Sequence, residues 1–157
     1  MLRPYQQNIK HNLFEAWRQY PSVMVQMPTG TGKTHLLASV ISDRTMADDT
    51  ASIWIVAHRR ELVEQIEETV ARYGISKDDG RVKVMSIQWL SKHWENVRDE
   101  RPGLIVIDEA HHALAGTYRD LWPRYPDAKK LGMTATPCRL NGKGFTDLFG
   151  TLITSDS

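Results

Sequence analysis

Short apolar runs alternate along the chain with longer stretches in which apolar residues recur every three or four positions. The runs are nearly continuous and rich in β-branched residues, as strands buried on both faces are. They lie at residues 22–26, 52–57, 82–86, 104–107 and 130–133. The stretches with helical spacing lie at residues 9–17, 34–42, 60–73 and 87–94. This alternation predicts an α/β fold, with a parallel sheet covered by helices on both faces.

Segments rich in helix-breaking and polar residues separate these elements. They lie at residues 46–50, 76–80, 100–103 and 141–144. Close to the end of the chain, Phe145, Leu148 and Phe149 are expected in the core. Residues 151–157 turn polar after a short apolar run, which suits the start of a linker to another domain.

Composition indicates one domain over residues 1–157, because 157 residues with 41% apolar content can bury one core. A net charge of +1 with 25% charged residues excludes a disordered chain and a free-standing basic DNA-binding module. Any nucleic-acid contact must therefore be local. No apolar stretch approaches the roughly 20 residues of a membrane span, and the N-terminus lacks the apolar region of a signal peptide. We expect a soluble, cytoplasmic protein without a membrane partner.

A glycine-rich segment with the sequence MPTGTGKT, residues 27–34, directly follows the first predicted strand. Gly30 and Gly32 allow a tight turn whose N–H groups point inward, and the helix that follows adds its positive end, forming an anion cradle. Lys33 can reach the β- and γ-phosphates, and the Thr34 hydroxyl can coordinate Mg²⁺. The segment therefore predicts a Walker A site for ATP and Mg²⁺, although Met27 stands where the general pattern has glycine. The predicted nucleotide-binding residues here are Thr29, Gly30, Thr31, Gly32, Lys33 and Thr34.

Two adjacent carboxylates, Asp108 and Glu109, directly follow the fourth predicted strand. Ligands of open parallel sheets bind at the carboxyl ends of the strands, so these side chains are expected to share a crevice with the phosphate loop. Asp108 would hold Mg²⁺, and Glu109 would orient or deprotonate the water that attacks the γ-phosphate. Taken alone, an Asp-Glu pair fits a helix N-terminus equally well. Together with the phosphate loop, it predicts ATP hydrolysis.

PTGTGKT and DEAH, the latter at residues 108–111, together resemble the DEAH-type superfamily 2 helicases and translocases. The segment at residues 137–145 resembles relatives near the XPB-like and the type I and type III restriction-enzyme motor branches. The resemblance covers residues 2–153. It implies a RecA-like P-loop NTPase fold. It also implies a catalytic set of Lys33, Asp108, Glu109 and His111.

Two further segments resemble nucleotide-site motifs of this family. Residues 2–6, LRPYQ, look like the Q-type motif, which implies that the Gln6 amide reads the adenine edge with Arg3 nearby. LGMTATP, which ends at Pro137, looks like motif III. The resemblance implies that Thr134 and Thr136 bond to the DEAH side chains and couple the nucleotide state to nucleic-acid binding.

The segment at residues 56–65 is similar to motif Ia, which in the family contacts the backbone of the bound strand. The similarity implies that Arg59, with His58, meets phosphates. Arg59 and Arg60 could instead only decorate a helix start. Cations there oppose the helix dipole, however, which favours an anionic partner.

MSIQWL, residues 85–90, resembles the Ib region and implies a second strand contact through Ser86, with Gln88 beside it. A plain helix start explains this segment equally well. DNA is favoured over RNA as the partner. Because backbone contacts carry no base information, the choice of nucleic acid and of single or double strand stays open.

In these motors ATP lies between two RecA-like lobes, and the second lobe supplies an arginine finger worth about 10³ to 10⁵ in rate. The residues after Thr136 are too few to encode a second lobe. We expect this chain alone to bind nucleotide, to hydrolyse it slowly at best and not to unwind. The motor part of a restriction system and a non-catalytic, nucleotide-dependent binding module are the alternatives.

Overall fold

The computed structural model describes residues 4–27, 32–47, 52–72, 74, 82–97, 99–108, 121–135 and 148–154. The strands within these residues are β1 (Ser22–Gln26), β2 (Ile53–Ala57), β3 (Val82–Ser86), β4 (Leu104–Asp108), β5 (Lys129–Thr134) and β6 (Thr151–Thr154). The helices are α1 (Pro4–Ala16), α2 (Lys33–Ala47), α3 (Arg60–Arg72), α4 (Ile87–Lys92), α5 (Trp94–Val97) and α6 (Leu121–Arg124).

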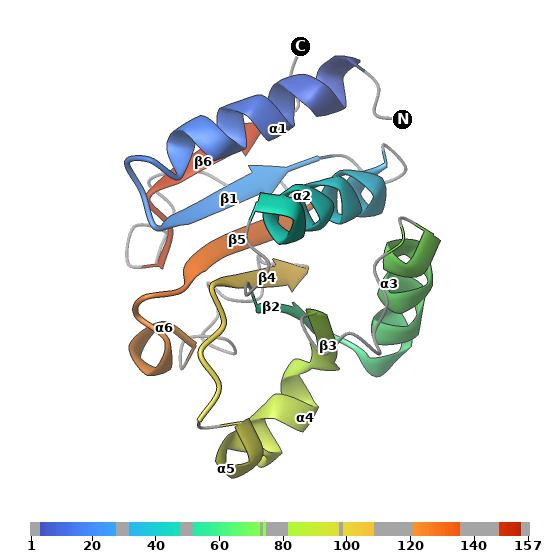
Figure 1. Ribbon diagram of the computed structural model, residues 1–157, viewed down its shortest axis with the longest axis vertical. Helices are drawn as coiled ribbons and strands as arrows, with labels where there is room; N and C mark the ends of the chain where they lie inside the picture. The colour runs from blue at the N-terminus through green and yellow to red at the C-terminus, as the bar shows by residue number, and fades with distance from the viewer. Residues whose placement is uncertain are drawn as a thin grey trace.

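All the strands join one sheet in the order β3-β2-β4-β5-β1-β6, and every pairing is parallel (Figure 1). The predicted strands are confirmed to within a residue at each end. Because the strands are parallel, their carboxyl ends lie along the same edge of the sheet. The segments that follow β1, β2, β3 and β4 are the ones in which the sequence places its candidate chemistry.

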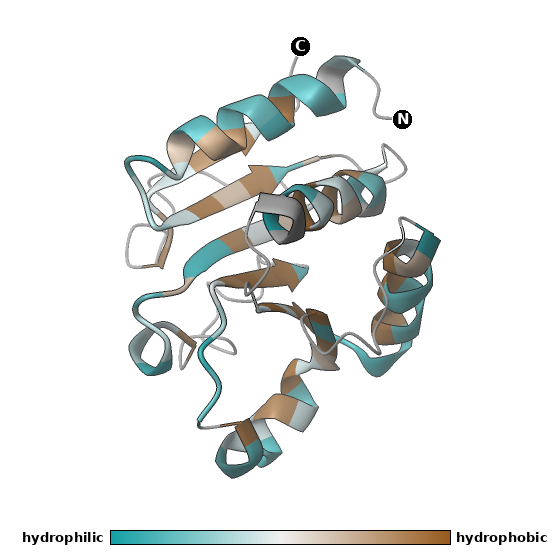
Figure 2. Ribbon diagram, viewed as in Figure 1, coloured by the Kyte–Doolittle hydropathy of each residue, from teal (hydrophilic) through white to brown (hydrophobic). Residues whose placement is uncertain are grey.

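Helices cover both faces of the sheet, which confirms the predicted α/β architecture. Successive residues of a strand point to opposite faces. In β1, Val23 and Val25 join the core cluster under α1, α2 and α3, whereas Met24 joins the cluster under α4, α5 and α6. The strands are accordingly among the most hydrophobic parts of the ribbon, while the helices carry mixed faces (Figure 2).

Several elements differ from the prediction. α1 begins at Pro4 rather than at residue 9, α2 runs to Ala47 rather than to residue 42, and the helix expected over residues 87–94 is divided into α4 and α5. Residues 151–154, expected to begin a linker, instead form the edge strand β6 beside β1. Their side chains are all half-buried, so the apolar signal is weaker than in the central strands. The sequence pattern also predicts no helix at α6. Leu148 and Phe149 are buried as expected, and Phe145 lies outside the described residues. Within the described part of the chain, no helix is long and apolar enough to cross a membrane.

A lysine is buried at the amino end of β5, on the α6 side of the sheet. The side chain of Lys130 is covered by α6 and the turn that follows it, and its ammonium donates to the carbonyls of Tyr125, at 2.7 Å, and Ala128, at 3.0 Å. It also lies 5.7 Å from the ring centroid of Trp122. Burial lowers the pKa of Lys130 from 10.5 to about 8, against a smaller opposing effect of the Asp127 carboxylate.

Replacing Lys130 with methionine should change how stability depends on pH. Because the folded-state pKa is depressed, the unfolded chain binds more protons between about pH 8 and 10.5, and the stability of the wild type should rise across that window. Relative to Lys130→Met, the wild type should gain about 2 kcal/mol of unfolding free energy between about pH 7.5 and 9.5. Urea unfolding at each pH measures this. Lys92→Met controls for the lost charge, and parallel curves for the wild type and Lys130→Met would contradict the prediction.

Candidate functional site

Gly32 forms the junction between the glycine-rich segment and α2. Its carbonyl accepts the first hydrogen bond of the helix from the Leu36 N–H, at 3.0 Å. Its φ of 83° lies in the left-handed region, where a side chain is strained and glycine is not. The chain can therefore turn sharply into α2, whose positive N-terminal end is directed toward the carboxyl edge of the sheet.

Gln6 connects α1 to this junction. It is buried, and its side-chain Nε2 donates a hydrogen bond of 3.1 Å to the Gly32 carbonyl. A β-carbon built on Gly32 would lie 2.2 Å from that Nε2 atom, so the amide occupies the space that a larger residue at position 32 would need. The two residues expected to contact adenine and phosphate thus lie against each other.

Lys33 and Asp108 form an ion pair between the first residue of α2 and the last residue of β4. The Lys33 Nζ lies 3.0 Å from Asp108 Oδ1, and their side chains are 19% and 10% exposed. Partial burial strengthens the attraction beyond that of a surface pair. The structure thus brings together the cation and the carboxylate that the sequence assigned to phosphate and metal.

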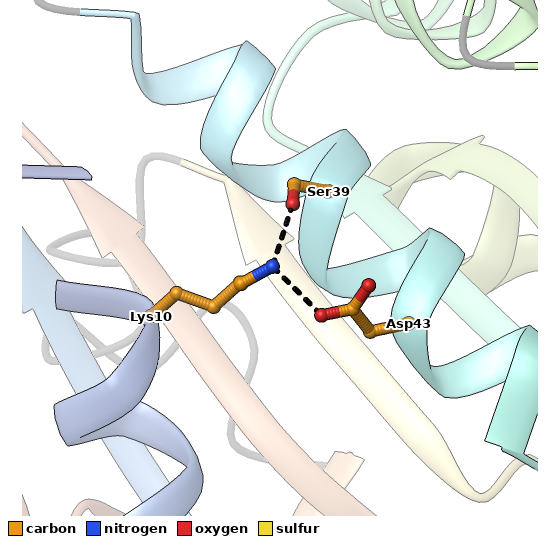
Figure 3. Close-up of polar contacts among 3 residues, drawn as sticks. All are labelled: Lys10, Ser39 and Asp43. Atoms are coloured by element: carbon orange, nitrogen blue, oxygen red, sulfur yellow. Dashed lines mark hydrogen bonds and ion pairs between the residues drawn. The ribbon is translucent and has the colours of Figure 1, made fainter. Parts of the chain in front are cut away.

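A second ion pair connects α1 with α2 (Figure 3). The Lys10 Nζ lies 2.7 Å from Asp43 Oδ2 and 3.1 Å from Ser39 Oγ. Lys10 is four residues after Gln6 and lies on the same side of α1, as the helical period requires. The contact joins the two helices that carry Gln6 and Lys33. The sequence analysis missed it, because no local pattern pairs residues 33 positions apart.

Thr134 ends β5 and is fully buried. Its carbonyl accepts a hydrogen bond of 2.9 Å from the N–H of Met27, the residue with which the glycine-rich segment begins. The strand pairing also places Met133 opposite Asp108 and Thr134 opposite Gln26. The predicted coupling residue therefore lies between the ends of β4 and β1.

Several predicted site residues lie outside the described residues: Arg3, Thr29, Gly30, Thr31, Glu109, His111 and Thr136. The backbone of Thr34 belongs to the first turn of α2, but its side chain is not described. The roles assigned to these residues stay predictions.

The segments predicted to contact a strand lie at the ends of β2 and β3. His58 is half-buried and Arg59 is exposed. Ser86 is buried and caps α4, since its Oγ accepts a hydrogen bond of 3.1 Å from the Trp89 N–H. The helix-start explanation of Ser86 is thereby confirmed, and a strand contact by its hydroxyl stays a prediction. Gln88 Nε2 donates to the His58 carbonyl at 2.9 Å, which ties the two segments together.

A parallel sheet with a glycine-capped helix after β1, and a lysine of that helix paired with an aspartate at the end of β4, defines a P-loop nucleotide-binding domain of the RecA-like kind. A family model described as "Type III restriction enzyme, res subunit" matches residues 1–139. The chain belongs to this family.

Individual relatives agree with this assignment. A 51.5 kDa protein of a Lactococcus phage is 31% identical over 130 residues, which are 83% of this chain and 27% of the relative. The DNA 3'-5' translocase XPB2 of Sulfurisphaera tokodaii is 27% identical over 138 residues, 82% of this chain and 30% of the relative. The chain thus spans less than a third of either protein.

The fold matches a solved helicase structure as well. The Hef helicase domain of Pyrococcus furiosus superposes with a TM-score of 0.75 at 20% identity, over 99% of this chain and 38% of that one. At that identity the likeness shows the fold alone. With the family match, it confirms the predicted class: an ATP-binding, N-terminal RecA-like lobe of the superfamily 2 type.

Replacing Gly32 with alanine should destabilise the fold and weaken nucleotide binding. The new β-carbon would displace the Gln6 amide, and the alanine would be held at a strained φ. Together these effects should lower the free energy of unfolding by about 2 to 3 kcal/mol. Gly74→Ala is the matched control, because Gly74 has a φ of 81° with no atom within 4 Å of the added carbon. The control should lose only about 1 kcal/mol. Thermal unfolding and titration with a fluorescent ATP analogue measure both effects, and equal losses in the two variants would refute the role of Gln6.

Proposed function

We propose that this chain is the ATP-hydrolysing half-site of a nucleic-acid helicase or translocase, completed by a second RecA-like lobe. The observation that carries the proposal is the 3.0 Å contact between Lys33 and Asp108 across the ends of α2 and β4. A cation and a carboxylate at this edge, beside the N-terminus of a helix, suit a bound triphosphate and its metal.

The residues present fit Mg²⁺. Magnesium is commonly held by one or two carboxylates together with substrate phosphates and water, rather than by a full protein cage. Asp108 supplies such a carboxylate, and Thr34 follows Lys33 in the same turn of α2. Among the described residues, no group of three or more acidic, histidine or cysteine side chains is placed so that it could hold a metal ion by itself. When bound, the metal would neutralise charge on the transferred phosphoryl group.

The chain's own residues divide the remaining work. Lys33 would neutralise charge on the β- and γ-phosphates, and Gln6 would hold adenine while bonded to Gly32. Glu109 would orient the attacking water, and Thr134 would transmit the nucleotide state through β5. An arginine of the second lobe would complete the transition-state contacts.

We further propose that the strand bound at His58, Arg59 and Ser86 is DNA. The XPB2 relative is a DNA 3'-5' translocase, which supports this choice. The family match to a restriction-enzyme subunit supports a second candidate, the motor part of a restriction system, which moves along duplex without separating its strands.

Replacing Lys33 with alanine should abolish tight ATP binding. Loss of the ammonium leaves the phosphate charge uncompensated, and the affinity for Mg²⁺-ATP should fall by at least about tenfold. Isothermal titration in the presence and absence of Mg²⁺ measures this. Arg18→Ala, which removes an exposed cation outside the phosphate site, should retain most of the affinity. A Lys33→Ala protein that is folded and binds ATP normally would defeat the proposal.

Replacing Glu109 with glutamine separates the motor from a pure binding module. With the second lobe supplied, hydrolysis should fall by about 10²-fold or more while ATP binding survives, because the amide cannot accept a proton from water. Phosphate release under single-turnover conditions measures the rate. Unchanged behaviour in every assay would favour the non-catalytic module.

A further inference from the structure

A groove of about 950 Å³ lies at the free end of the sheet, between the segments that follow β2 and β3. One wall comes from the start of α3 and the other from α4 and the residues after it. The hydrogen bond from Gln88 to the His58 carbonyl joins the two walls at the carboxyl edge. The lining residues that matter for ligand chemistry are Arg59, Arg60, Trp89, Lys92 and His93.

Trp89 is the most exposed of the large hydrophobic residues in the described part of the chain, at 40%. Its indole stacks on the imidazole of His93, with ring centroids 4.2 Å apart and planes only 10° from parallel. His93 is held in turn, because its Nδ1 lies 2.6 Å from the Trp89 carbonyl and donates to it. The imidazole covers one face of the indole, and Trp89 itself is among the residues that line the groove.

The position of Trp89 is not explained by the core. Ile87 and Leu90 are the residues of α4 that bury themselves against the sheet. Trp89 lies off that apolar face, on the side that lines the groove. An aromatic ring oriented by a stacked neighbour is suited to receive a second flat ring.

The charges around the ring favour an anionic ligand. Arg59, Arg60 and Lys92 are exposed, and none of them makes an ion pair with another described residue. Among the described residues that line the groove, Glu61 is the only acidic one. Further along α3, an adjoining hollow shares Arg60 and Glu61 with the groove and is also lined by Glu64 and Glu68, whose charges would keep a polyanion on the α4 side.

We propose that Trp89, supported by His93, is a stacking platform for an unpaired base, so that this groove takes a single strand whose backbone lies along the neighbouring cations. A duplex keeps its base faces stacked inside and could use only the cations. Base stacking on an aromatic side chain is tolerant of sequence, which suits a protein that moves along a strand. The inference rests on the proposed nucleic-acid function and specifies which form of strand this lobe holds.

The test compares ligands of equal length that differ in their bases. The whole chain is titrated with an oligothymidine of about 12 nucleotides, with the matching abasic strand and with a duplex, by fluorescence anisotropy. The wild type should bind oligothymidine about tenfold more tightly than the abasic strand, since one stacked base is worth about that factor. Trp89→Leu should bind both strands with the abasic affinity, and Trp89→Phe should keep part of the difference. An oligouridine titration tells whether RNA serves as well as DNA.

Tyr20→Leu is the control, because Tyr20 is similarly exposed, at 38%. It precedes β1, which lies toward the end of the sheet opposite to β3. The control variant should leave the ratio of affinities unchanged. Equal affinity of the wild type for oligothymidine and abasic strand, or an unaltered ratio in Trp89→Leu, would overturn the stacking proposal while leaving strand binding intact. If the wild type binds none of the ligands, the nucleic-acid function fails, and the stacking proposal fails with it.

Discussion

The parallel direction of the strands is the constraint on which both candidate sites depend. Every pairing in the sheet is parallel, so each strand delivers its following loop to the same edge. Lys33 follows β1 and Asp108 ends β4, with β5 between them in the sheet, yet their charged atoms lie 3.0 Å apart. The β2 and β3 ends form the groove next to them. The candidate nucleotide site and the proposed strand-binding groove therefore occupy neighbouring stretches of one edge of the same sheet.

The sequence predicts the elements whose signal is local. Central strands buried on both faces appear as continuous apolar runs, and their bounds agree with the structure to within a residue. The edge strand β6 is half-buried, and its sequence, TLIT, is short and half polar, so the pattern there suits a linker as well as a strand. Four-residue α6 is too short to show helical spacing and contains Pro123. The burial of Lys130 could not be predicted either, because nothing in the local sequence indicates that the turn after α6 will cover a charged side chain.

The candidate site divides along similar lines. Lys33 and Asp108 could be assigned from motifs, since glycine-rich phosphate loops and acidic strand ends carry their chemistry in adjacent residues. The bonds that position them join residues distant in the chain: Gln6 with Gly32, and Lys10 with Asp43. Such partners depend on how α1 packs beside α2, which no short pattern records. The sequence indicates Trp89 only weakly, as an aromatic residue off the apolar face of its helix. Its stack on His93 and its place in the lining of the groove are visible only in the structure.

The hydrogen bond between Gln88 and the His58 carbonyl bears on the spacing between the two walls of the groove. Its two walls continue from neighbouring strands, and neighbouring strands lie about 4.8 Å apart because main-chain hydrogen bonds hold them there. The side chains of the groove therefore determine which ligand it attracts, while the main chain of the sheet determines how far apart its two walls lie. Substitution of the exposed side chains would therefore change what the groove attracts without altering the spacing of its walls, which the sheet sets.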